Sequence, residues 1–212
     1  MSGVLRIARI LAPVTVLGPG RRVGLWVQGC TLSCPGCASM DTWDPASGRM
    51  MTTAEVAASI VGAAEADPTI TGVTITGGEP IQQGHALADM LAAVRRTQRG
   101  RDVDVLVFTG YSFEAAQRRA PNLLDAVDAV VTGRYDATAG HGGPLRGSAN
   151  QRLHRLSDRF PSMTEDTAPT IQATVIDGDI VMVGIPAPGD LDTFRILLAD
   201  RGVSLGEVSW RS

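Results

Sequence analysis

The sequence predicts an α/β domain built around a mainly parallel sheet. Runs of β-branched residues alternate with stretches of helical periodicity through most of the 212-residue chain, which is the pattern of strand–helix–strand units. Three of the predicted strands end in a small or polar cluster, beginning at Thr76, Thr109 and Thr132. The length fits one domain with a small appendage. We therefore expect a core at residues 1–160 and an extension at 161–212.

The N-terminal part of the core is predicted to be two strands followed by a loop and a helix. Residues 4–16 and 22–27 are rich in aliphatic and β-branched side chains, and a Gly-Pro-Gly turn separates them. A cysteine-containing loop follows the second strand. The helix begins at a capping box, Thr52-x-x-Glu55, and its apolar residues recur at helical spacing until Pro68.

The rest of the core repeats a strand and helix pattern. Strands are predicted at 70–75, 103–108 and 126–131, with helices between them around 87–94 and 113–119. Because the carboxyl ends of parallel strands meet at one edge of a sheet, their polar clusters should lie together, and ligands of such sheets bind at that edge.

The C-terminal part predicts a loop at 136–144, a polar linker at 162–170, and then a hairpin and a helix. The hairpin strands, 171–176 and 180–185, flank Asp177-Gly178-Asp179, which is a strong turn signal. The last helix is expected at about 191–200.

Composition excludes several classes of function. The net charge is −3, and all 19 basic residues are Arg, so mechanisms that need a Lys, such as the P-loop site or a pyridoxal phosphate Schiff base, are ruled out. The acidic balance and the few aromatic residues argue against nucleic acid as a partner. The sequence shows neither a secretory leader nor an apolar run of membrane-spanning length. We therefore expect a cytoplasmic protein without a membrane partner.

The strongest chemical signal is the cysteine motif Cys30-x-x-x-Cys34-x-x-Cys37. Three cysteines in one short window cannot pair off into a disulfide framework, and soft thiolate ligands select iron–sulfur clusters, Zn or Cu(I). The three His residues of the chain lie far from this window, so no fourth zinc ligand stands at finger-like spacing. A 4Fe-4S cluster held by three thiolates would keep one iron open. A zinc knuckle or unligated core cysteines remain the alternatives.

A second signal is Gly77-Gly78-Glu79-Pro80, at the end of an apolar strand. Paired glycines let a ligand approach the backbone, and a carboxylate can accept hydrogen bonds from an ammonium group. The same residues are also common in an ordinary turn. Their place one strand–helix unit after the cysteine loop favours the ligand hypothesis.

Several ordered motifs together resemble the radical S-adenosylmethionine (SAM) activating enzymes of glycyl-radical proteins, and in particular the group that activates anaerobic ribonucleoside-triphosphate reductase. The resemblance covers residues from about 14 to 152. The motifs that carry it are 17–22, 26–37, 41–43, 77–80, 108–111 and 146–151.

The resemblance implies a partial, open (β/α) barrel of the radical SAM type, with the hairpin and helix as a small C-terminal extension. It implies that the three cysteines hold a 4Fe-4S cluster whose open iron binds SAM. Binding of SAM is expected from two sets of residues. In the first set, Gly77, Gly78 and Glu79 would contact the methionine amino group and Pro80 would shape the turn. The second set matches family positions near the cofactor and consists of Thr109, Arg134 and Asn150.

The resemblance also implies a reaction and its partners. A flavodoxin or ferredoxin would supply one electron, SAM would be cleaved reductively to methionine and a 5′-deoxyadenosyl radical, and that radical would take hydrogen from a glycine of an anaerobic ribonucleotide reductase-like enzyme. No catalytic side chain is expected, because the chemistry is borne by the cofactor. Two alternatives are the same chemistry on a peptide or small molecule, and a non-catalytic zinc-binding or cluster-binding interaction protein.

Overall fold

A computed structural model describes residues 3–97, 103–162, 171–176, 179–187 and 189–204, and shows a mixed α/β fold around a seven-stranded sheet. The order of the strands is β3-β1-β2-β4-β5-β6-β7. Four neighbouring strands, β2, β4, β5 and β6, are parallel, while β1, β3 and β7 join antiparallel. The bounds are β1 Val4–Val14, β2 Arg21–Val27, β3 Arg49–Thr52, β4 Ile70–Gly77, β5 Asp104–Thr109, β6 Ala129–Thr132 and β7 Arg152–Arg155.

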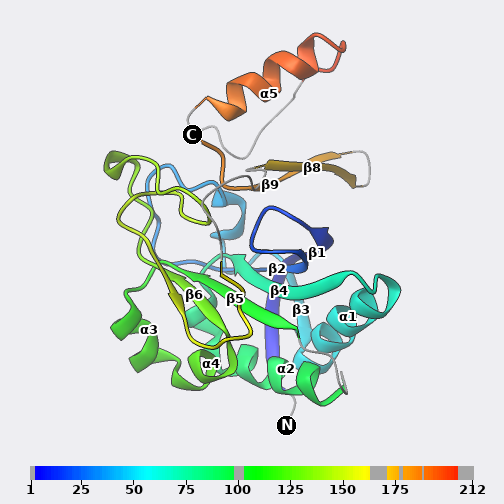
Figure 1. Cartoon of the computed structure of the whole chain (residues 1–212), viewed down its shortest axis with the longest axis vertical. Coiled ribbons are helices and arrows are strands. Elements are labelled where there is room, and N and C mark those ends of the chain that lie inside the picture. Colours follow the sequence, from blue (N-terminus) through cyan, green and yellow to red (C-terminus); the bar gives the residue numbers. More distant parts are fainter. Residues whose placement is uncertain (1–2, 98–102, 163–170, 177–178, 188, 205–212) are drawn as a thin grey trace.

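Helices cover one face of this sheet and enclose the main core (Figure 1). Helix α1 (Thr53–Ala66) begins at the predicted capping box, in which the Thr52 hydroxyl accepts from the Glu55 amide and the Glu55 carboxylate accepts from the Thr52 amide. The other helices of the core are α2 (Gly84–Thr97), α3 (Phe113–Arg119) and α4 (Pro121–Ala126). Their buried aliphatic side chains pack on alternate residues of the central strands, such as Leu25, Ile75 and Val107.

The opposite face of the sheet carries a buried ion pair at its base. Arg22, on β2, is fully buried, and its guanidinium binds both carboxylate oxygens of Asp104 on β5. Burial raises the pKa of Asp104, against the opposing effect of its hydrogen bonds to Arg22. The Phe160 ring lies 5.9 Å from the guanidinium carbon. This pair closes one end of the face and leaves the end at the carboxyl termini of the strands for a cavity.

The C-terminal segment forms a separate two-stranded hairpin and a helix. The hairpin consists of β8 (Ile171–Ile176) and β9 (Asp179–Gly184), which pair antiparallel, and α5 spans Asp190–Ala199. Figure 1 shows them on the side of the sheet away from α1–α4, with the hairpin between α5 and the end of β1. Residues 163–170 of the expected linker and 177–178 of the expected turn lie outside the described residues.

Most of the predicted elements are confirmed, and the differences have physical causes. The edge strands β3 and β7 were not predicted, because each has only four residues and neither contains a run of β-branched residues. The strand predicted at 126–131 was wrong at its start: Ala126 ends α4, and β6 begins at Ala129. Between them the buried Asp128 carboxylate accepts from the Val105 amide, which ties this position to β5 through a side chain.

The open barrel and the boundary at 161 stay predictions. The structure shows a mixed sheet and a separate two-stranded hairpin. No helix in the described residues is long and apolar enough to cross a membrane.

Candidate functional site

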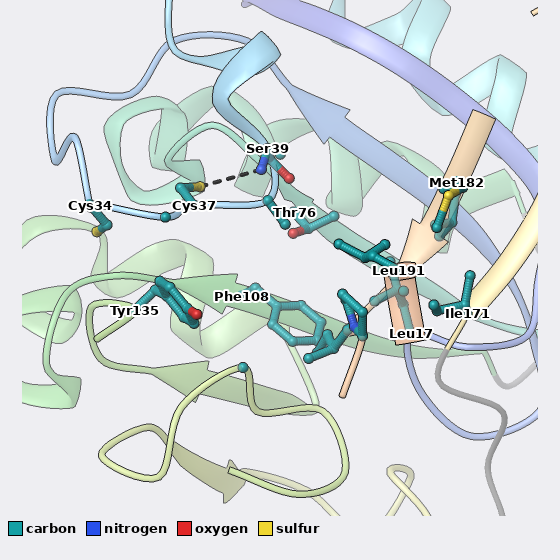
Figure 2. A pocket seen from close by; sticks show the side chains of 18 of the residues that line it. Leu17, Cys34, Cys37, Ser39, Thr76, Phe108, Tyr135, Ile171, Met182 and Leu191 are labelled. Atoms are coloured by element: carbon teal, nitrogen blue, oxygen red, sulfur yellow. Dashed lines mark hydrogen bonds between the residues drawn. The ribbon is translucent and has the colours of Figure 1, made fainter. Parts of the chain in front are cut away.

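A large cavity of about 1310 Å³ lies at the carboxyl ends of the parallel strands. Its walls include all three cysteines, Thr76 and Phe108 at the ends of β4 and β5, and Gly133 directly after β6. The polar clusters that end the predicted strands thus meet at one edge, as expected. Figure 2 shows Cys34 and Cys37 on one side of this cavity, with Phe108 and Leu17 further along it.

The cysteine loop is closed at its base by backbone hydrogen bonds. The Gly29 amide donates to the Thr42 carbonyl at 2.8 Å, and the Cys30 amide donates to the Trp43 carbonyl at 3.0 Å. The buried side chain of Gln28 also spans the base, because its amide group donates to the carbonyls of Asp41 and Asp44. These bonds fix the cysteines on a closed loop whose base continues β2.

The three thiols differ in their surroundings. Cys34 is buried, whereas Cys30 and Cys37 are half-buried, and none forms a disulfide. The Ser39 amide donates to the Cys37 sulfur at 3.4 Å (Figure 2). Burial raises the pKa of the Cys30 thiol, and backbone hydrogen bonds from Leu32 and Ser33 oppose that effect.

This donor set fits an iron–sulfur cluster. Three free thiols on one loop line the same cavity, and thiolates are the ligands that such clusters take. Among the described residues, no three His, Cys, Asp or Glu side chains gather closely enough to hold a single metal ion. A cluster presents several iron atoms to its ligands, so the thiolates need not converge on one point.

The paired glycines after β4 let the strand end approach the cysteine loop. The Gly78 amide donates to the Val27 carbonyl at 2.8 Å, and the Glu79 amide donates to the Gly29 carbonyl at 2.9 Å. A Cβ on Gly78 would lie 2.2 Å from the Gly29 oxygen, and Gly77 has a φ of +97°. Glycine is therefore required at position 78 because the backbone of the cysteine loop, at Gly29, lies too close for a side chain.

Glu79 is turned inward and joins the ends of β4 and β5. Its carboxylate is 1% exposed and accepts three hydrogen bonds: from the Thr109 hydroxyl at 2.7 Å, the Ile81 amide at 2.9 Å and the Gly110 amide at 2.8 Å. Burial raises the pKa of Glu79, while these three donors oppose the rise. The side chain expected to meet the SAM amino group thus also acts as a buried clamp between two strand ends.

The remaining predicted residues lie at different places around the site. Thr109 lines the cavity together with Glu79, whereas Pro80 begins the short helix η2 (Pro80–Gln83) and is not part of the lining. Arg134 and Asn150 are exposed and are not part of the lining, although they are linked: the Asn150 amide donates to the Arg134 carbonyl at 2.8 Å. The Arg134 guanidinium donates to the Leu32 carbonyl and so holds the cysteine loop to the chain after β6.

Several lining residues were not predicted. Arg9 on β1 lines the cavity, pairs with Asp41 of the cysteine loop and lies 5.8 Å from the Trp26 ring. Gln151 also lines it and donates to the Gly133 carbonyl at 2.9 Å. The extension adds a further wall, which includes Met182 and Leu191. No local motif marks Arg9 or Met182, because only the folded chain brings β1 and β9 to the strand ends.

Comparison with known proteins places the chain in a family. Residues 16–154 match the family model described as a 4Fe-4S single cluster domain. The chain is similar to three proteins named anaerobic ribonucleoside-triphosphate reductase-activating protein. That of Enterobacteria phage T4 is 33% identical over 68% of this chain and 89% of the phage protein. Those of Vibrio cholerae and Escherichia coli K12 are 31% and 30% identical, each over 68% of this chain and 95% of the relative. The chain therefore belongs to the 4Fe-4S single cluster domain family and, within it, to the radical SAM group of glycyl-radical activating enzymes.

Proposed function

We propose that this protein binds a 4Fe-4S cluster and SAM in the cavity and generates a glycyl radical on an anaerobic ribonucleotide reductase-like partner. The observation that carries the proposal is the closed loop that presents Cys30, Cys34 and Cys37 to a cavity at the carboxyl ends of parallel strands. Family membership supports the same proposal, since the match spans both the cysteine loop and those strands.

When bound, the cluster and SAM would supply the chemistry, which is one-electron reductive cleavage of the S–C5′ bond of SAM. The resulting methionine and 5′-deoxyadenosyl group would allow transfer of one hydrogen atom from a glycine Cα, leaving 5′-deoxyadenosine and a glycyl radical. The chain's residues bind and orient these groups. The three thiolates hold the cluster. Glu79 keeps the strand ends in register through Thr109 and Gly110, so that the half-exposed Gly77 and Gly78 can face the methionine group.

Arg134 and Asn150 complete the proposed site indirectly. Through its bond to the Leu32 carbonyl, Arg134 holds the cysteine loop, and Asn150 in turn fixes the backbone of Arg134. We propose that the electron comes from a flavodoxin or ferredoxin, which must approach the half-buried side of the cysteine loop, where Cys30 and Cys37 lie.

The first experiment tests the cofactor. Protein reconstituted anaerobically with iron and sulfide is expected to bind iron, absorb in the visible range and convert SAM to 5′-deoxyadenosine when reduced. Cys34→Ala should lose most of the iron and the cleavage. Met50→Ala, which removes an exposed sulfur on β3 outside the cavity, is the matched control and should keep both. A colourless protein holding one zinc would contradict the proposal and favour a zinc-binding interaction protein.

The second experiment tests the partner. An anaerobic ribonucleoside-triphosphate reductase, mixed with the reduced protein and SAM, should acquire a glycyl radical that appears as a doublet in electron paramagnetic resonance. Turnover of a peptide or small molecule without the reductase, and without that doublet, would show that the same cofactors serve another substrate.

A further inference from the structure

The C-terminal extension supplies a wall of the cavity that lies outside the family match, which ends at residue 154. Eight consecutive residues, 180–187, line the cavity, together with Ile171 of β8 and Leu191 of α5. Figure 2 shows Met182, Ile171 and Leu191 on the opposite side of the view from Cys34 and Cys37.

One face of the hairpin is fixed to the core. Val183 of β9 is buried in a cluster with Leu17 and Trp26. Its cross-strand neighbour Gln172 accepts from the Thr15 amide at 2.9 Å and donates to the Pro13 carbonyl at 2.8 Å. The hairpin is therefore held against the end of β1 by an apolar cluster and by the hydrogen bonds of Gln172 to Pro13 and Thr15.

The edge of β9, rather than a face, borders the cavity. Successive side chains of a strand point to opposite faces, so a strand that showed one face to a cavity would contribute only alternate residues. Consecutive residues of β9 line it, whereas β8 contributes only Ile171. β8 occupies one edge of β9, and among the described residues no backbone hydrogen bond joins Met182 to any other segment. Among the residues that the structure describes, the second edge of β9 is thus unpaired, and it borders the cavity.

The register identifies which backbone groups this edge offers. Two residues separate Ile176 from Asp179, which face each other, and such a closing pair exchanges both of its backbone hydrogen bonds, with successive pairs alternating. The pair Ala173–Met182 is then a non-hydrogen-bonded pair. The amide and carbonyl of Met182 therefore point away from β8, at the edge of β9 that borders the cavity, and those of Ala173 point away from β9 on the far edge.

We propose that the open edge of β9 binds the glycine-bearing segment of the partner as an added strand. This inference rests on the proposed function. The target of that chemistry is a backbone Cα, and glycine offers no side chain to hold, so recognition must come from main-chain groups and from flanking residues. An open strand edge supplies alternating amides and carbonyls, and this one lies on the same cavity as the cysteines. The apolar side chains of Leu17 and Phe108 also line that cavity and would receive the flanking residues.

The test compares proline at the two edges of one cross-strand pair. Met182→Pro removes an amide that faces the cavity, and Ala173→Pro removes the equivalent amide on the edge that does not line it. With an anaerobic ribonucleoside-triphosphate reductase as the probe, Met182→Pro should raise the half-saturating reductase concentration for radical formation about tenfold, the cost of one backbone hydrogen bond. Ala173→Pro should behave as the unmodified protein does.

Amide hydrogen exchange of the unmodified protein gives a second readout, independent of radical formation. Adding the reductase should slow exchange at Ile180 and Met182, and leave Val181 and Val183, whose amides already face β8, unchanged. Equal half-saturation for the two proline variants, or exchange at Met182 that the reductase does not slow, would overturn the docking proposal. The docking proposal would also be overturned if the chain alone forms a dimer that Met182→Pro abolishes, because the edge of β9 would then bind a second copy of the chain. Absence of 5′-deoxyadenosine from the unmodified protein would instead overturn the proposed function.

Discussion

Replacing Gly78 by Ala should push the end of β4 away from the cysteine loop. The added Cβ would lie 2.2 Å from the Gly29 oxygen, where an ordinary contact is at least 3.4 Å. Neither atom can move alone, because both belong to backbone that is joined by the Gly78–Val27 and Glu79–Gly29 hydrogen bonds. Each bond is worth about 1 kcal/mol, and overpacking costs about 1–3 kcal/mol. If both bonds are lost, we expect the free energy of unfolding to fall by about 3–5 kcal/mol.

Urea unfolding and iron content together measure this effect. Gly78→Ala should unfold at a lower urea concentration and, because Gly29 precedes the first cysteine, should bind less iron after reconstitution. Gly62→Ala is the matched control: Gly62 lies inside α1 with nothing within 4 Å of an added Cβ, so the change should stabilise the protein by about 0.5–1 kcal/mol. If Gly78→Ala has the wild-type urea midpoint and full iron content, the close approach does not constrain the site and the reasoning is refuted.

Four further changes test other parts of the structure by urea unfolding. Arg22→Met leaves the buried Asp104 carboxylate without its partner and should destabilise the fold by about 3–5 kcal/mol. Glu79→Gln turns an amide NH₂ toward a hydrogen-bond donor and should cost about 1–3 kcal/mol. Thr52→Ala removes the cap of α1 and should cost about 1 kcal/mol. Asp67→Asn tests pH dependence: hydrogen bonds lower the pKa of Asp67 from 3.8 to about 2, so its stabilisation is present above pH 3.8 and is lost as pH falls toward 2.

Each of these predictions has a result that would contradict it. If Arg22→Met has wild-type stability, the ion pair is not needed. If the double variant Arg22→Met/Asp104→Leu regains the stability lost by Arg22→Met, the unpaired Asp104 carboxylate is the cause of the loss. Glu79→Gln or Thr52→Ala at the wild-type midpoint would show that the hydrogen bonds named are not needed. For Asp67→Asn, a stability difference from wild type that widens as pH falls below 3.8 would reverse the expected sign.

Local patterns in the sequence were sufficient for the main elements of the fold. The capping box at Thr52 specifies the start of α1 because both of its hydrogen bonds lie within four residues. The β-branched runs predict β4 and β5, and the spacing of the cysteines indicates the chemistry of the site, because ligand type and spacing are properties of one short segment. Alternation of strand and helix further predicted that the polar strand ends would meet.

Tertiary structure alone decided the details that depend on distant parts of the chain. The sequence marks Glu79 as a polar residue at a strand end, but its burial against Thr109 and Gly110 follows from the pairing of β4 with β5. The place of Met182 on the cavity likewise depends on the contact of β9 with Trp26, which is more than 150 residues away. Short-range hydrogen bonds and periodicity can be read from neighbouring residues, whereas contacts between distant segments arise only when the chain packs into one core.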